Sequence, residues 1–121
     1  MPETTAQDDV RFDILTLFPE MFHPVLRNSM LGIAAEKQLV EYHLHNIRDY
    51  TEDKHGKVDD RPYGGGPGMV LKCQPVFSAY ENIKACDERT PRLIMLSPQG
   101  RCFDQRLANE LSQASRLMLL C

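Results

Sequence analysis

The sequence lacks any long apolar run and any export signal. No stretch of its 121 residues approaches the roughly 18 apolar residues that span a bilayer. The opening residues, MPETTAQDD, show no basic region followed by an apolar segment, so they do not resemble a signal peptide. We therefore expect a protein without membrane association, located in the cytoplasm.

Clustered cysteines are also missing. The four cysteines are widely spaced and form no C-x-x-C pair, which argues against a structural zinc site and favours reduced thiols. They are Cys73, Cys86, Cys102 and Cys121. Glu41, His43 and His45 alternate along one predicted strand face and could ligate a metal, but a solvated strand face is the simpler interpretation.

Positive charge is not in excess. The net charge of −3 equals the charge of Glu3, Asp8 and Asp9 near the N-terminus, and the rest of the chain is balanced. Such a chain has no global positive field, so RNA binding would require a local patch or a partner subunit. The content of 42% apolar and 26% charged residues is typical of a globular domain. We predict a disordered acidic tail at residues 1–10 and one domain over residues 11–121.

Four segments predict β-strands. Residues 10–18 are rich in β-branched and aromatic side chains, and residues 40–47 alternate between apolar and polar ones. Residues 93–96 form a continuous apolar run, which is typical of a strand covered on both faces. Residues 116–121 predict a second apolar strand.

Helical patterns separate these strands. Residues 19–39 have helical spacing, and Pro24 and Gly32 predict two short helices instead of one long one. A further helix is predicted over residues 75–85, and Asp104 can cap another. A strand, tight turn, helix and strand in succession at the C-terminal end form a βαβ unit, whose strands are parallel. The order as a whole predicts an α/β fold with a mostly parallel sheet flanked by helices.

The segment VDDRPYGGGPGMVLK, residues 58–72, holds four of the seven glycines. It lacks the spacing G-x-x-x-x-G-K-[ST] and the spacing G-x-G-x-x-G, which argues against a nucleotide hydrolase and a Rossmann dehydrogenase. A flexible surface loop would carry Ser, Asn and Lys among its glycines. Here prolines are interleaved with the glycines, which favours a fixed backbone path.

A fixed path with few side chains would let backbone amides approach a flat group such as a nucleobase. Asp59 and Asp60 could accept hydrogen bonds from base N–H groups, and Arg61 could meet a phosphate. Tyr63 could stack on a base. This interpretation is the one we prefer for the segment.

Three segments together resemble one known family. DILTLFPEMF, RDYTEDKHGKVDDRPYGGGPGMVLK and LSPQGRCFDQ closely resemble the bacterial tRNA (guanine-N1)-methyltransferases of the SPOUT superfamily. The resemblance runs in register from residue 11 to residue 121, and DDRPYGGGPGM is its most specific run.

The resemblance implies an α/β fold with a deep trefoil knot. It also implies transfer of a methyl group from S-adenosylmethionine to N1 of the guanosine 3′ of the anticodon in tRNA, by a homodimer with active sites at the subunit interface. Magnesium is left open as a second cofactor, and we assign no metal ligands. N1 lies on the base-pairing edge, so the guanosine must be extruded to react.

The family's motifs assign site residues by matching positions. The residues matching one wall of the cofactor pocket are Leu96, Ser97, Pro98, Gln99 and Gly100. The residues matching the guanosine side are Asp59, Arg61, Tyr63, Gly64, Gly65 and Gly66. Of the second group, Asp59 is the residue expected to contact the RNA.

The chain departs from the family pattern at its C-terminal end. In the family, the strand matching residues 116–121 continues into a G-R-Y-E-G-D-E-R-type segment, and a later Asp acts as the general base. Neither is present, so we expect the N-terminal part of the domain, truncated at a core strand, without the knot-completing segment. Residues 1–121 then contain no catalytic base and are inactive alone. The alternative is a non-catalytic α/β module that binds RNA or a partner.

Overall fold

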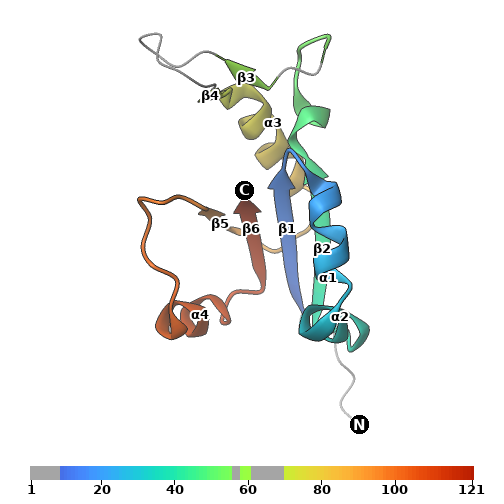
Figure 1. Ribbon diagram of the computed structural model, residues 1–121, viewed down its shortest axis with the longest axis vertical. Coiled ribbons are helices and arrows are strands. Elements are labelled where there is room, and N and C mark those ends of the chain that lie inside the picture. The colour runs from blue at the N-terminus through green and yellow to red at the C-terminus, as the bar shows by residue number, and fades with distance from the viewer. Residues whose placement is uncertain (1–8, 56–57, 61–69) are drawn as a thin grey trace.

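The computed structural model describes residues 9–55, 58–60 and 70–121. The described residues form a four-stranded sheet in the order β2-β1-β6-β5, in which every neighbouring pair is parallel (Figure 1). Its strands are β1 (Val10–Thr16), β2 (Val40–Asn46), β5 (Arg92–Met95) and β6 (Arg116–Leu120). The predicted α/β class with a mostly parallel sheet is confirmed.

The segment between β1 and β2 is broken into short helices, as predicted. They are η1 (Pro19–Met21), α1 (His23–Leu26) and α2 (Ser29–Glu36). The break between α1 and α2 lies at residues 27–28, and Ser29, which follows it, has a φ of 56°, outside the right-handed helical region. Gly32 does not cause it: Gly32 is buried within α2, where an added Cβ would collide with the backbone carbonyl of Arg27.

The remaining helices are η2 (Ile47–Tyr50), α3 (Cys73–Lys84) and α4 (Gln105–Leu111). Helix α3 packs on one face of the sheet around the apolar core, which consists of Leu15, Ile47, Val58, Ala79, Ile83 and Met118. Helix α2 meets the other face, where the Tyr42 hydroxyl donates to the Leu31 carbonyl over 3.1 Å and the Tyr42 ring lies against Phe12. The sheet is therefore flanked by helices on both faces.

Strand β5 corrects one prediction. Its apolar run was expected to be covered on both faces, but Leu93 is 49% exposed and Met95 is 65% exposed. The reason is its place at the edge of the sheet, with α4 forming the opposite wall of an open groove. In β6, by contrast, Leu117 and Met118 are buried between β1 and β5.

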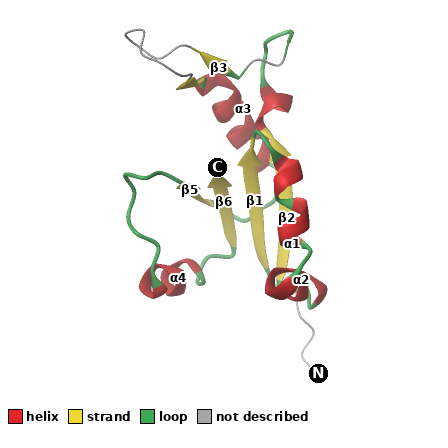
Figure 2. Cartoon of the chain, viewed as in Figure 1, coloured by secondary structure: helices red, strands yellow, loops and turns green. Residues whose placement is uncertain are grey.

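A second, two-stranded sheet pairs β3 (Asp59–Asp60) with β4 (Val70–Leu71) in antiparallel register. It lies close to the start of α3, beyond the carboxyl ends of β1 and β6 (Figure 2). Among the helices described, none is long and apolar enough to span a membrane.

Candidate functional site

An open groove of about 780 Å³ follows the carboxyl end of β5. It is bounded by β5, by the segment leading to α4, by α4 itself and by Leu119 of β6. The predicted cofactor residues Leu96, Ser97, Pro98 and Gly100 line this groove, whereas Gln99 is not among the lining residues. The position agrees with the rule that ligands bind beyond the carboxyl ends of parallel strands.

The groove's end wall is a tight turn. The Leu96 amide donates to the Leu120 carbonyl over 3.1 Å, which extends the β5–β6 pairing by one residue. The Gly100 amide then donates to the Ser97 carbonyl over 3.1 Å, and the Gln99 amide donates to Ser97 Oγ over 3.2 Å. Pro98 occupies the turn position whose φ its ring fixes. The sequence SPQG thus forms a local turn next to an apolar strand.

The groove walls are apolar and its rim is charged. Met95 is 65% exposed and Phe103 is 69% exposed, and both line the groove. At the rim, Arg101 Nη2 donates to Glu110 Oε2 over 3.0 Å, and Arg92 lies 3.8 Å from the same carboxylate oxygen. An apolar groove with a backbone turn at one end suits a flat, partly apolar ligand such as a purine nucleoside.

The residues predicted to lie on the guanosine side are described only in part. Asp59 pairs with Leu71 in the β3–β4 ladder, and the Lys72 amide donates to the Val58 carbonyl over 2.6 Å at the base of the ladder. The other predicted residues lie outside the described residues: Arg61, Tyr63, Gly64, Gly65 and Gly66. The structure thus brings four of the five predicted cofactor residues together in one groove and places Asp59 on a separate hairpin.

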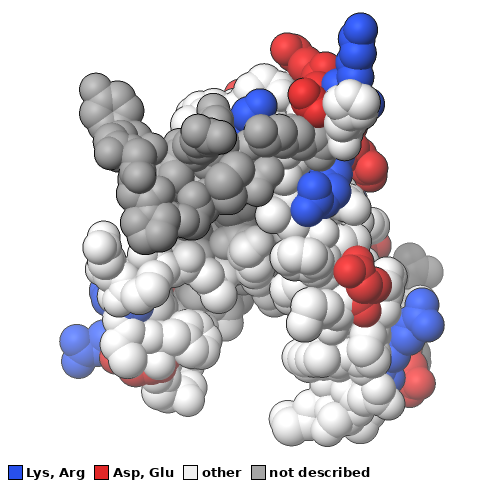
Figure 3. Space-filling model, turned by 45° about the horizontal axis from the view of Figure 1, so that its top comes forward, with Lys and Arg blue, Asp and Glu red and all other residues white. Residues whose placement is uncertain are grey.

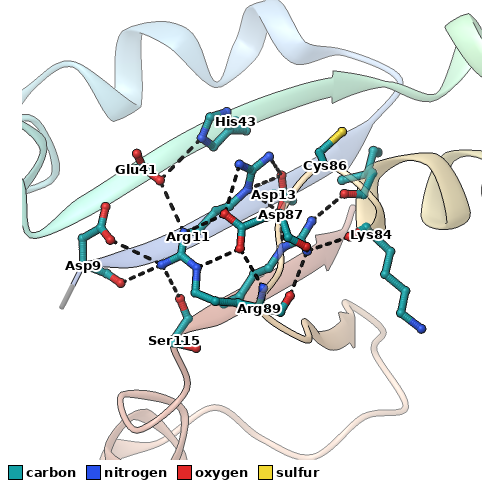
Figure 4. Close-up of polar contacts among 12 residues, drawn as sticks. Asp9, Arg11, Asp13, Glu41, His43, Lys84, Cys86, Asp87, Arg89 and Ser115 are labelled. Atoms are coloured by element: carbon teal, nitrogen blue, oxygen red, sulfur yellow. Dashed lines mark hydrogen bonds and ion pairs between the residues drawn. The ribbon is translucent and has the colours of Figure 1, made fainter. Parts of the chain in front are cut away.

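A buried charged cluster is the main feature that sequence reasoning missed. Asp13, in the middle of β1, is fully buried and accepts hydrogen bonds from three side chains. Figure 4 shows it next to Arg11. Arg11 donates through Nε and Nη2 over 3.1–3.2 Å, and Arg116 donates through Nε over 2.9 Å. His45 Nε2 lies 2.9 Å away and donates its proton, because a carboxylate only accepts. The cluster joins β1, β2 and β6.

Arg116 also completes the C-terminal end of α3. Its two Nη atoms donate to four backbone carbonyls over 2.6–3.2 Å, those of Ile83, Lys84, Asp87 and Arg89. The last carbonyls of a helix have no partner within the helix, and the helix dipole favours a cation there. A fully buried arginine at the start of β6 therefore anchors the end of α3 and the turn that follows it.

These contacts determine the protonation of Asp13. Burial by itself raises the pKa of Asp13, but the hydrogen bonds from His45, Arg11 and Arg116 outweigh it and hold the pKa well below the usual range. At the edge of the cluster, the hydrogen bonds from Arg89 lower the pKa of Asp87. A signal was present in the sequence, since Asp13 and Arg116 are charged residues inside otherwise apolar strands.

Glu41, His43 and His45, considered above as metal ligands, do not point toward one common site. His43 lies 3.8 Å from Glu41, and both are partly exposed. His45 is turned toward Asp13 and its side chain is only 16% exposed, so it departs from the expected solvated face. Within the described ranges, no group of three His, Cys, Asp or Glu residues could hold a metal ion.

The surface charge is mixed. On the face shown in Figure 3, basic and acidic side chains are interspersed, and much of the described surface carries no charge. Neither sign forms a large patch among the described residues on this face.

The described residues thus form an α/β domain with a parallel four-stranded sheet and an open groove at the carboxyl end of an edge strand. The family model described as tRNA (guanine-1)-methyltransferase TrmD matches residues 10–121, and the chain belongs to this family. The family resemblance read from the sequence is confirmed. The trefoil knot stays a prediction.

Known relatives agree with this assignment. The chain is 52% identical over 112 residues to the tRNA (guanine-N(1)-)-methyltransferase of Ruminiclostridium cellulolyticum, and 54% identical over 112 residues to that of Brevibacillus brevis. Both alignments cover 93% of this chain, but only 48% and 45% of the respective relatives. The chain thus spans about half the length of these relatives.

A solved structure has the same fold. The crystal structure of tRNA (m1G37) methyltransferase from Aquifex aeolicus superposes with a TM-score of 0.85 at 35% sequence identity. The match covers 93% of this chain and 50% of that chain.

Proposed function

We propose that this chain is part of an enzyme that methylates N1 of the guanosine 3′ of the anticodon in tRNA, with S-adenosylmethionine as the methyl donor. The observation that carries the proposal is the LSPQG turn at the carboxyl end of β5, in a chain that belongs to the tRNA (guanine-1)-methyltransferase family. The alternative, a non-catalytic module that binds RNA, has no comparable support.

The groove fits the nucleoside part of the donor. Met95 and Phe103 offer apolar surface for a purine, and the Ser97–Gly100 turn offers backbone groups at its edge. S-adenosylmethionine, when bound, supplies a methyl group on a positively charged sulfur. In this proposal, residues 96–100 hold and orient the adenosine end.

In this proposal, the guanosine is held by residues outside the donor groove. Asp59 and the glycine-rich segment position the extruded base so that N1 lies in line with the donor's carbon–sulfur bond. A carbon–nitrogen bond then forms as the carbon–sulfur bond breaks, and the N1 proton passes to a general base. We assign no base to residues 1–121, so the proton acceptor belongs to another part of the enzyme.

The partners follow from this assignment. We propose tRNA as the substrate and a homodimer as the working unit, with its active sites at the subunit interface. Asp59 and the groove at β5 lie on different elements, so both must be brought to one reaction centre in the assembled enzyme. Any magnesium requirement is to be measured in the same assay, by adding and chelating the ion.

The proposal is tested by incubating the full-length protein with labelled S-adenosylmethionine and a tRNA transcript that carries guanosine 3′ of the anticodon. We expect one methyl group per tRNA, located at N1 by a reverse-transcription stop. A transcript with adenosine at that position is the control and should remain unlabelled. Binding of the first tRNA without methyl transfer would reject the proposal in favour of the binding module.

A further inference from the structure

We propose that Gln74 is a positioning residue for Asp59, an inference that rests on the proposed function. Gln74 lies at the start of α3, just after the β3–β4 hairpin that carries Asp59. Its side chain connects α3, which follows the hairpin in the chain, to the backbone at Tyr50 and Glu52, which precedes the hairpin. The structure thus has a clamp across the base of the hairpin.

The clamp consists of two hydrogen bonds from one half-buried amide. Gln74 Nε2 donates to the Tyr50 carbonyl over 3.0 Å, and Gln74 Oε1 accepts from the Glu52 amide over 3.2 Å. Both distances lie within the ordinary range for protein hydrogen bonds. Because glutamine carries a donor and an acceptor side by side, it can satisfy a carbonyl and an amide of one backbone segment at once.

The backbone that receives the clamp has few regular partners. Tyr50 is the last residue of η2, and the carbonyls at the end of such a helix have no partner within it. Glu52 lies in the irregular stretch between η2 and β3. Gln74 therefore adds hydrogen bonds to a backbone stretch that is otherwise held through the packing of the Tyr50 side chain against the core.

The hairpin needs this support because it is short. Its ladder consists of Asp59 with Leu71 and Asp60 with Val70, and a short two-stranded ladder is marginal on its own. Val58, which is buried in the core, fixes the entering side, and α3 fixes the leaving side. Gln74 links the two sides to each other.

Helix α3 is a firm base for the clamp. Pro75, Ala79 and Ile83 are buried along one side of α3, so the helix cannot shift easily against the core. Gln74 precedes the buried Pro75 in α3, so its backbone position is fixed by the packing of Pro75. Without the clamp, the entering side keeps its apolar anchors at Tyr50 and Val58 but loses its hydrogen bonds to α3, so Asp59 is held less precisely. A displacement of about 1 Å at a reacting group can cost up to about a hundredfold in rate.

The test is Gln74→Met in the full-length protein, because methionine keeps the length of the side chain and loses both hydrogen bonds. We expect the single-turnover methylation rate to fall by about tenfold to a hundredfold, while the Kd for S-adenosylmethionine changes by less than about twofold. Gln74→Glu keeps only the acceptor for the Glu52 amide and should give an intermediate rate. Gln113→Met is the matched control, since Gln113 is exposed, does not line the groove and bonds through its side chain to the neighbouring Ser112.

Two kinetic results would overturn the inference. One is a Gln74→Met rate equal to that of the wild type. The other is an equal loss of cofactor affinity and rate, which would mean a general structural role. If the wild-type protein proves inactive on tRNA, the proposed function fails and hydrogen exchange tests the clamp alone. Gln74→Met should then speed exchange at residues 58–60 and leave β5 unchanged, and unchanged exchange at residues 58–60 would overturn the clamp.

Discussion

Arg116 Nε lies 2.9 Å from Asp13 Oδ2 in the fully buried interior, although 103 residues separate the two in the chain. Arg116 also holds four carbonyls at the end of α3, and Asp13 also accepts from Arg11 and His45. Both charges are removed from water, so each is stabilised by the opposite charge and by hydrogen bonds in place of water.

We expect Asp13→Asn to destabilise the protein strongly. The substitution leaves the guanidinium groups of Arg11 and Arg116 buried without their carboxylate, and breaking such a pair typically costs about 3–5 kcal/mol. The free energy of unfolding, from denaturant titration of the full-length protein, measures this. Glu110→Gln, which removes an exposed partner of Arg101, is the control and should cost less than about 1 kcal/mol. If both variants lose the same free energy of unfolding, the buried position of the Asp13 cluster does not raise the cost of breaking it.

Stability should also depend on pH through Asp13. Its pKa is depressed in the folded state, so it contributes stability that is fully present above its unfolded pKa and is lost as the pH falls toward the folded value. We therefore expect the free energy of unfolding to decrease below about pH 4, the region of an ordinary aspartate pKa. Denaturant titrations at several pH values should show a shallower decrease for Asp13→Asn. An identical slope in both proteins would contradict this assignment.

Gly32→Ala should destabilise α2. The added Cβ would collide with the backbone carbonyl of Arg27, which cannot move away as the end of a flexible side chain could. Overpacking of this kind costs about 1–3 kcal/mol. The thermal unfolding midpoint should fall, whereas Glu36→Ala, at an exposed position of the same helix, should leave it nearly unchanged. An unchanged midpoint for Gly32→Ala would mean that the α1–α2 turn can relax.

Asp59→Ala should weaken methylation through the guanosine and not through the cofactor. We expect a loss of at least about tenfold in kcat/KM for tRNA, because the base is positioned less well. The Kd for S-adenosylmethionine, from calorimetry, should stay within about twofold. Glu81→Ala, on the exposed face of α3, provides a charge-matched control. A parallel loss of cofactor binding in Asp59→Ala would refute this division of roles.

Gly100→Val should show the opposite pattern. A Cβ at Gly100 would lie 3.3 Å from the Ser97 carbonyl oxygen, which is closer than ordinary contact, so a branched side chain would displace that carbonyl and distort the turn. We expect S-adenosylmethionine binding to weaken by at least about tenfold, since the turn forms the end wall of the groove. Affinity for tRNA, measured by filter binding without cofactor, should be retained. Full cofactor affinity in Gly100→Val would exclude residues 96–100 from the pocket.

Local patterns predicted much of this fold. The alternation in residues 40–47 and the cap at Asp104 are properties of short segments, and the structure contains β2 and an Asp104 carboxylate that accepts from the Leu107 amide over 2.8 Å. The parallel sheet followed from the βαβ rule, which needs only the order of elements. The turn residues at 97–100 were also visible, because proline and glycine report local backbone geometry.

Non-local features escaped the sequence. The exposure of Leu93 depends on the place of β5 at the edge of the sheet, which composition does not encode. The partner of Asp13 lies on a strand near the other end of the chain. The amide of Gln74 looks like any surface glutamine until the positions of Tyr50 and Glu52 are known. In each case the missing information was which distant segments meet.

The separation of Asp13 and Arg116 along the chain also bears on how the domain folds. Strand β1 is made early in synthesis, yet its interior carboxylate finds its guanidinium partner only after β6 has emerged from the ribosome. Until then, Asp13 has only Arg11 and His45 as described partners, and closing the sheet would bury a carboxylate without one of its three donors. The central pairing of β1 with β6 is thus a late, long-range event, and it should make folding slow for a domain of this size.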